Sequence, residues 1–155
     1  MEVDPYGVGP NSPPGAIRPA TAADATRIAA LSGELGYPSD PAEIASRLAR
    51  LTASDTDLVV VAERPEAGVV GWVHAAEQEL LESGPRCEIL GLVVGQAARR
   101  GGVGRALVRA VQSWAAARGL PEVTVRSNIA RAESHPFYER LGFTRVKTQH
   151  VYRMR

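Results

Sequence analysis

The chain has 155 residues and a formal net charge of +1, from 18 Lys and Arg against 17 Asp and Glu. That length suits one domain with a sizeable core, and the balanced charge points away from nucleic acid and acidic membrane surfaces as partners. The single cysteine, Cys87, excludes an internal disulfide and fits a reducing compartment. Because no signal peptide is visible and no apolar run approaches the ~20 residues of a membrane span, we expect a soluble, cytoplasmic protein.

The N-terminal part of the sequence indicates a flexible tail followed by the first strand of a folded domain. Residues 1–15 are rich in Pro and Gly with almost nothing to bury, which indicates a flexible segment. Residues 16–155 are left for one folded domain. Its first strand is expected at Ile17-Arg18, where Pro19 ends it.

Two helices are expected next. Thr21 and Asp24 have the spacing of an N-terminal capping box, with Asp in place of the usual Glu, and that helix ends at Gly36. Asp40-Pro41 opens the second helix, since proline is favoured in the first turn. Each helix carries one apolar stripe. The stripes comprise Ile28, Leu31 and Leu35 in the first helix and Ile44, Leu48 and Leu51 in the second.

Three strands are predicted in the middle of the chain. Residues 57–63 (DLVVVAE) form an almost continuous apolar run that is typical of a central strand. A hairpin turn at residues 64–68 leads to a returning strand at residues 69–76. We interpret residues 78–86 as a loop, followed by a β-branched, apolar strand at residues 88–94.

A helix dominates the C-terminal half. Its apolar positions recur at helical spacing from Val103 to Trp114, and Gly119 and Pro121 supply the stop. The predicted order is β-αα-βββ-α-β-α-ββ, an α/β arrangement. The elements expected after the helix are a strand at residues 122–127, a partly helical segment at 128–142, and two last strands at 143–147 and 148–154.

The turn that joins the strand at residues 88–94 to this helix suits a phosphate-bearing ligand. A helix N-terminus carries unpaired N–H groups and a partial positive charge, and glycines let a phosphate approach the backbone. Arg99, Arg100 and Arg105 add cationic donors that suit phosphate geometry. The turn is no P-loop, since Gly-Lys-Ser/Thr occurs nowhere in the chain. It is no dinucleotide fingerprint either, since Leu107 stands where that motif needs Gly or Ala.

What remains is Arg99-x-x-Gly102-x-Gly104, after a strand that ends in Leu92-Val93-Val94. This stretch resembles the signature Gln/Arg-x-x-Gly-x-Gly/Ala with which the GNAT superfamily of N-acetyltransferases binds acetyl-coenzyme A. The order of elements over residues 16–155 resembles that family as well. The resemblance implies a single domain with the GNAT fold, a mixed, mostly antiparallel sheet of roughly six or seven strands flanked by about four helices.

The resemblance also implies acetyl-CoA as co-substrate. Its pyrophosphate would lie at the helix start, and its pantetheine arm would lie along a strand that splays from its neighbour. Backbone groups of that strand would bond the pantetheine amides, and the Val94 N–H would polarise the thioester carbonyl. The residues that the resemblance assigns to acetyl-CoA are Leu92, Val93, Val94, Arg99, Arg100, Gly101, Gly102, Val103, Gly104, Arg105, Ala106 and Asn128.

A second motif, from Asn128 to Phe143, is similar to the GNAT segment N-x(5)-A-x-x-F-Y-x-x-L-G-F. It implies that Asn128 bonds the pantetheine arm and that the Tyr138 hydroxyl protonates the departing thiolate. An ordinary half-buried tyrosine is the alternative for Tyr138. Ser134 and Pro136 depart from the family pattern, and since proline is tolerated only in a first turn, we expect the helix to begin near Ser134.

Glu88 is the candidate general base. Several GNAT enzymes carry a glutamate four residues before the strand position that matches Leu92, and a carboxylate in an otherwise apolar strand suits a base. Two alternatives stand beside this role. Glu88 could lie at the solvated start of its strand and pair with Arg86 or Arg126, or water could relay the proton without a dedicated base.

Tyr37, Trp72 and His74 are candidate walls of an acceptor site. Trp72 and His74 share one strand face, and Tyr37 lies in the connector between the two helices, where acceptor sites of the family are often shaped. Placement in the core or on the surface is the alternative for each. No His, Cys, Asp and Glu cluster has metal-ligand spacing, so no metal is expected.

These residues together predict an N-acetyltransferase. It would move an acetyl group from acetyl-CoA to a primary amine of a small molecule, by direct attack in a ternary complex. The alternatives are a protein acetyltransferase acting on lysine or an N-terminus, and a non-catalytic CoA-binding or interaction module. Pairing of sheet edges through residues 148–154 would allow a homodimer.

Overall fold

The computed structural model describes residues 15–99, 101–129 and 134–155. Its frame is a five-stranded sheet in the order β1-β2-β3-β4-β5. Neighbours from β1 to β4 are antiparallel, and β5 is parallel to β4. The strands are β1 (Ala16–Pro19), β2 (Asp57–Arg64), β3 (Gly68–Leu80), β4 (Gly84–Val94) and β5 (Val123–Val125).

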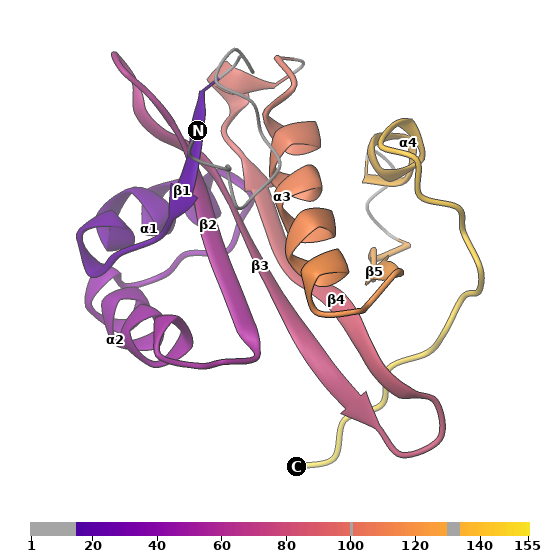
Figure 1. Cartoon of the computed structure of the whole chain (residues 1–155). Helices are drawn as coiled ribbons and strands as arrows, with labels where there is room; N and C mark the ends of the chain where they lie inside the picture. The colour runs from indigo at the N-terminus through magenta and orange to yellow at the C-terminus, as the bar shows by residue number, and fades with distance from the viewer. Residues whose placement is uncertain (1–14, 100, 130–133) are drawn as a thin grey trace.

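Helices cover both faces of this sheet (Figure 1). Helices α1 (Ala25–Glu34) and α2 (Pro41–Thr52) lie against one face, and α3 (Val103–Ala117) lies against the other. The short helix α4 (Ser134–Arg140) lies beyond α3, beside β5. Two 3₁₀ turns, at Ala22–Asp24 and Gln96–Ala98, precede α1 and α3.

The core consists of two hydrophobic clusters, one on each face of the sheet. Val60 and Leu107 belong to the cluster under α3, whereas Val61 and Leu31 belong to the cluster under α1 and α2. Val60 and Val61 are both 0% exposed, so β2 is buried on both faces, as its continuous apolar run predicts. No helix in the described part of the chain is long and apolar enough to cross a membrane.

Most of the predicted helix boundaries are confirmed. The Thr21 N–H donates to Asp24 Oδ2 at 2.8 Å, which makes the acidic half of the expected capping box. Asp40 Oδ1 accepts from the Ala42 N–H at 3.0 Å at the start of α2. At the end of α3, Gly119 has φ +77 and the Leu120 N–H donates to the Ala115 carbonyl at 2.9 Å, as a glycine helix stop requires.

The loop predicted at residues 78–86 is wrong. β3 and β4 continue as a long antiparallel hairpin, in which Leu80 pairs with Gly84 across a short turn. Gly84 has φ +78, which lets the chain reverse there. The polar residues of this stretch lie on a hairpin that extends beyond the helices (Figure 1), so their hydrophilic pattern comes from solvent exposure and not from a loop.

The prediction of six or seven strands is also wrong, because the described sheet has five. Residues 143–147 and 148–154 form no strand. The C-terminal arm, residues 144–155, is exposed throughout, with Val151 at 89% and Tyr152 at 90%. The neighbouring strand β5 has only three paired residues, so it offers this chain little to pair with. The flexible tail predicted at residues 1–15 lies, except for Gly15, outside the described residues.

An ion pair joins β1 to the start of α1, and we expect it to stabilise the fold. Two guanidinium nitrogens of Arg18 donate to the Asp24 carboxylate at 2.8 and 2.9 Å, and Arg18 Nε donates to Glu63. These hydrogen bonds from Arg18 lower the pKa of Asp24, against a smaller opposite effect of burial. Because the folded pKa lies below the unfolded one, the stabilisation is complete above about pH 4 and is lost as pH falls through the folded pKa.

The Asp24→Asn variant should therefore lose about 2–4 kcal/mol of unfolding free energy at pH 7, and less at pH 3. Urea unfolding at the two pH values measures the difference. The matched control is Glu43→Gln, which breaks an exposed pair with Arg47 and should change stability by less than about 0.5 kcal/mol. Equal losses for Asp24→Asn at both pH values would contradict this account.

Candidate active site

The parallel strands β4 and β5 pair over a short stretch and then diverge. Their register runs from Cys87 opposite Val123 to Ile89 opposite Val125, and in the described residues no further β5 partner follows. On its other edge, β4 stays paired with β3 as far as Val94. Backbone groups of residues 90–94 that face away from β3 are therefore available to a ligand. This is the splayed strand that the family resemblance implies.

Helix α3 begins beside the end of β4. A Cβ placed on Gly104 would lie 3.7 Å from a Val94 methyl carbon and 2.8 Å from the Phe137 ring, so three segments meet closely there. Gly102 is the N-cap with φ +85, a left-handed conformation that favours glycine. Gly102 has no side chain with which to cap this helix start. Its N–H groups and partial positive charge suit an anion.

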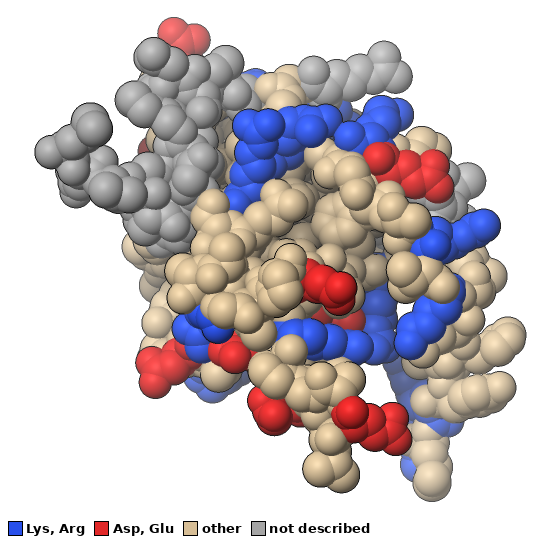
Figure 2. All heavy atoms as spheres, turned by 45° about the vertical axis from the view of Figure 1, so that its right-hand side comes forward, with Lys and Arg blue, Asp and Glu red and all other residues tan. Residues whose placement is uncertain are grey.

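Two of the three predicted arginines flank this helix start. Arg99 and Arg105 are exposed, and Figure 2 shows basic side chains gathered on the upper part of this face, where α3 starts. Arg99 Nε lies 3.5 Å from the Val94 carbonyl oxygen, and Arg105 donates to the Arg140 carbonyl at 3.0 Å. Arg100 lies outside the described residues. Val103 and Ala106, also predicted here, are buried on the helix side that faces the core.

Helix α4 holds Tyr138 near the start of α3. The helix begins at Ser134, as Pro136 predicts. Phe137 packs on Gly104, and the Tyr138 ring contacts Phe137 and Phe143 edge to face, with centroids 5.2 and 5.7 Å apart. Tyr138 is half-buried. Asn128 is exposed on the segment that leaves β5.

Glu88 is buried in β4 and held by two arginines. It is 6% exposed, its Oε1 accepts from Arg126 Nε at 3.0 Å, and Arg86 Nη2 lies 3.6 Å away. Both ion pairs that the sequence suggests are therefore present. The solvated position considered for Glu88 is wrong, because β4 begins at Gly84 and the extended hairpin buries this carboxylate.

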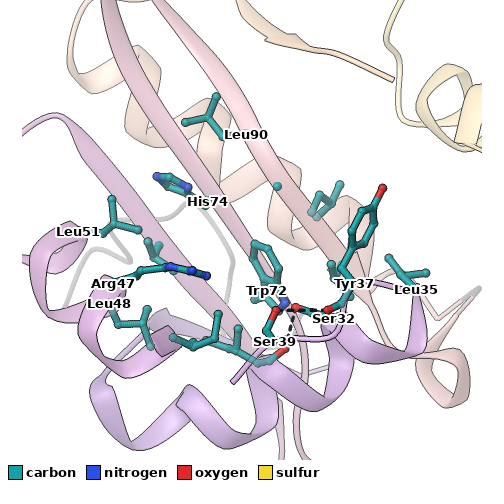
Figure 3. A pocket seen from close by; sticks show the side chains of 16 residues that line it. Ser32, Leu35, Tyr37, Ser39, Arg47, Leu48, Leu51, Trp72, His74 and Leu90 are labelled. Carbon is teal, nitrogen blue, oxygen red and sulfur yellow. Dashed lines mark hydrogen bonds between the residues drawn. The ribbon is translucent and has the colours of Figure 1, made fainter. Parts of the chain in front are cut away.

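A pocket of about 420 Å³ lies between α1, α2, β3 and β4 (Figure 3). All three predicted acceptor-site residues, Tyr37, Trp72 and His74, line it. Leu92 and Val93 line it as well, so it reaches the strand segment that diverges from β5. Its volume is in the range of small-molecule sites. The pocket therefore joins the region suited to acetyl-CoA to a separate space for a second small molecule.

His74 is held by a carboxylate that the sequence analysis did not identify. Its Nε2 lies 2.8 Å from Asp57 Oδ1, and Asp57 Oδ2 accepts from Ser54 Oγ at 2.7 Å. Burial alone would raise the pKa of Asp57, but hydrogen bonds from His74, Ser54 and Thr56 together lower it. Asp57 thus stays charged and fixes one ring nitrogen of His74, which leaves the other nitrogen for another partner.

The position of Trp72 on the floor of the pocket requires a glycine at residue 91. A Cβ placed on Gly91 would lie 2.8 Å from the Trp72 ring, so the ring lies directly against the backbone of β4. Leu90 has no partner in the register between β3 and β4, which makes an irregularity opposite His74 and Ala75. This irregularity places both Leu90 and Gly91 in the pocket lining.

Arg47 of α2 also lines the pocket. The sequence does not single it out, because an arginine beside the apolar stripe of a helix is usually an ordinary solvent-exposed side chain. The hairpin turn alone does not place Asp57 beside His74. Regular pairing about the turn at residues 64–68 would set Val59 opposite Val73, with Asp57 and His74 on opposite faces. The irregularity between Ala62 and Glu63 shifts the register by one residue, so Val59 lies opposite His74 and Asp57 is a diagonal neighbour of His74 on the same face.

Neither a reactive thiol nor a metal site is found in the described residues. Cys87 is 0% exposed, and burial, with a smaller contribution from Glu77, raises its pKa to about 11. It is a thiol at neutral pH and packs as a small hydrophobe, as predicted. The described chain has no group of three His, Cys, Asp or Glu side chains that could hold a metal.

Known proteins resemble this chain in sequence and in fold. An aminoglycoside N(6')-acetyltransferase type 1 of Klebsiella aerogenes is 31% identical over 98 residues, which make up 61% of this chain. The chain thus covers 64% of that curated relative's length.

Solved structures share the fold. The apo form of the aminoglycoside 6'-N-acetyltransferase AAC(6')-IG from Acinetobacter haemolyticus has a TM-score of 0.79, with 22% identity over 90% of this chain and 98% of its own. The aminoglycoside N-acetyltransferase AAC(6')-Iy in complex with CoA has a TM-score of 0.81, with 20% identity over 96% of this chain and 99% of its own. The model of the acetyltransferase (GNAT) family matches residues 26–143. The chain belongs to the GNAT family of acetyltransferases.

Proposed function

We propose that this protein transfers an acetyl group from acetyl-CoA to a primary amine of a small molecule, by direct attack in a ternary complex. The observation that carries the proposal is the divergence of β4 from β5 beside the uncapped start of α3. Those two features offer unpaired backbone groups to the pantetheine arm and N–H groups to the pyrophosphate. The adjoining pocket gives the amine its own place, so no covalent enzyme intermediate is required.

Acetyl-CoA is the co-substrate in this scheme. Residues 101–106 at the helix start bind its pyrophosphate, with Arg99, Arg100 and Arg105 as cationic partners. Leu92 bonds the pantetheine through its backbone, and Asn128 bonds it from the segment after β5. The backbone groups of Val93 face β3, as do those of Gly95, whose N–H donates to the Val70 carbonyl at 2.9 Å. The support is the divergence of β4 from β5 and the contact of Gly104 at the start of α3 with the end of β4.

The thioester needs two hydrogen-bond donors during transfer. The Val94 N–H stabilises the oxyanion, since β4 has no β5 partner at that level. The Tyr138 hydroxyl protonates the departing thiolate. This role of Tyr138 is supported by the contact of the neighbouring Phe137 with Gly104, which holds α4 against the first turn of α3.

The amine must lose a proton before it attacks, and His74 is better situated to accept it than Glu88. His74 lines the pocket and pairs across the sheet with Gly91, next to Leu92. Glu88 lies four residues from Leu92, about 13 Å along a strand, and is occupied by Arg126. With Nε2–H donated to Asp57, the Nδ1 lone pair of His74 can take the proton from the amine. Asp57 then stabilises the imidazolium.

Release of free thiol from acetyl-CoA in the presence of an amine panel tests the function, with the acetylated product identified by its mass. Thiol release that depends on the amine supports an enzyme acting on small molecules. Binding of acetyl-CoA without transfer would support the non-catalytic module instead. Acetylation of a lysine peptide but of no small amine would support the protein acetyltransferase. A cytoplasmic location fits this function, since a chain with the single cysteine Cys87 needs no oxidising compartment to form an internal disulfide.

A second copy of this chain is the partner that the C-terminal arm favours. We propose that residues 144–155 pair with the partner's sheet edge, because a hydrophobic row of the arm lies in solvent at 84–94% exposure. That row consists of Val146, Val151, Tyr152 and Met154. Light scattering should give a dimer for the wild type and a monomer for the Val151→Asp/Met154→Asp variant. A monomeric wild type would contradict the pairing.

A further inference from the structure

Arg47 gives the acceptor pocket a positive charge. Among the described residues that line the pocket, none is Asp or Glu, and His74 is the base of the proposed transfer. The two carboxylates recorded next to these side chains are already engaged. Asp57 Oδ1 lies 2.8 Å from His74 Nε2, and Glu43 Oε2 lies 3.4 Å from Arg47 Nη2. Apolar side chains make up most of the remaining surface, including Trp72 on the floor.

Arg47 extends from α2 into the pocket in the direction of Trp72 (Figure 3). Its partner Glu43 is one helical turn away, and the two side chains are 54% and 63% exposed. An exposed pair of this kind holds its arginine weakly. The guanidinium can therefore bind a second anion, and its planar fork matches a carboxylate in two parallel hydrogen bonds.

A polycationic acceptor does not suit this pocket. Each ammonium group that enters gives up water, and carboxylates in the lining would have to compensate for that loss. The described lining has none, and Arg47 adds repulsion between like charges. The several amino groups of an aminoglycoside would require such carboxylates, which the described lining lacks. Proteins similar to this chain are nevertheless named aminoglycoside acetyltransferases.

We infer that the acceptor is a primary amine with an apolar, ring-sized body and a carboxylate, whose carboxylate binds Arg47. The inference rests on the proposed function, since it names the acceptor for that transfer. The Trp72 ring lines the pocket next to Gly91 and offers an aromatic surface to the apolar body. With the carboxylate at Arg47, the amine is placed within reach of His74, which lines the same pocket.

Matched amines with and without a carboxylate test this inference on the full chain. We would measure thiol release for 4-(aminomethyl)benzoate against benzylamine, for L-phenylalanine against phenethylamine, and for kanamycin as a polycation. The carboxylate member of at least one pair should have a kcat/KM about 10- to 100-fold above its twin, the effect of one charge-assisted contact. The Arg47→Gln variant should bring that ratio close to one.

Arg50→Gln is the matched control, because Arg50 lies on the same helix but contacts Ser46 and does not line the pocket. It should keep the ratio of the wild type. A wild type that prefers kanamycin, or an Arg47→Gln variant that keeps the ratio, would overturn the inference and leave the acetyltransferase intact. Failure of acetyl-CoA to bind would instead remove the proposed function.

A binding measurement decides the case in which no probe is acetylated. In a Trp114→Phe background, Trp72 is the remaining tryptophan, and its fluorescence reports on the pocket. Saturable binding of 4-(aminomethyl)benzoate, weaker for benzylamine and weaker again after Arg47→Gln, upholds the inference. Equal signals from the two amines overturn it.

Discussion

Replacing His74 with phenylalanine should lower kcat/KM for acetyl transfer by about 100-fold or more, the usual contribution of a general base. The variant keeps an aromatic ring in the pocket but removes the nitrogen that Asp57 orients. Because the missing group is a base, the loss should be recovered partly at high pH, where more of the free amine is already neutral. The measurement is the pH dependence of kcat/KM, from thiol release.

Two comparison variants make this expectation specific. Tyr138→Phe should also lower kcat, by removing the proton donor to the thiolate, but high pH should not restore it. Glu88→Gln should change kcat within about threefold and lower the stability, because Arg86 and Arg126 lose a buried carboxylate partner. A large loss of rate in Glu88→Gln with an unaffected His74→Phe would make Glu88 the base, as the family resemblance implies.

Replacing Gly102 with glutamate should abolish acetyl-CoA binding. Gly102 is the N-cap of α3 with φ +85, so a side chain there brings backbone strain, bulk and negative charge to the proposed pyrophosphate site. A 100-fold excess of acetyl-CoA over its Kd should raise the melting temperature of the wild type by roughly 5–10 °C. The Gly102→Glu variant should show no such rise.

The other end of the same helix supplies the control. Gly119 has φ +77 with open space around it, so Gly119→Glu carries the same substitution and a similar backbone strain. That variant should be destabilised to a similar extent, yet acetyl-CoA should still raise its melting temperature. Loss of the rise in both variants would mean that the effect reflects general instability and not the site.

Local signals predicted the parts of the fold that sequence-adjacent residues decide. The starts and stops of α1, α2 and α3 follow from Thr21, Asp40-Pro41 and Gly119, whose hydrogen bonds and dihedral angles involve residues a few positions away. The apolar run of β2 likewise predicted its burial on both faces.

What depends on distant segments was harder to predict. A hydrophobic pattern at residues 143–154 indicated two strands, but a strand needs a partner edge, and the described β5 has only three paired residues. Polar residues at 78–86 indicated a loop because the pattern does not distinguish a loop from a solvent-exposed hairpin.

The residues of the candidate site also differ in whether the sequence predicted them. The predicted strand face and helix connector indicated one acceptor site for Tyr37, Trp72 and His74. All three residues line the pocket. Asp57 and Arg47 became evident only through the packing of β2 and α2 around that pocket. The charges that distinguish one acceptor from another therefore come from tertiary contacts, and the family motif does not contain them.

Calorimetric titration of the wild-type protein with acetyl-CoA measures the complex from which every proposed step of the transfer starts. We expect saturable binding of one acetyl-CoA per chain, which Gly102→Glu loses and Gly119→Glu keeps. No heat of binding from the folded wild type would contradict the account, and it would leave a GNAT fold whose divergent strands and uncapped helix serve some other ligand.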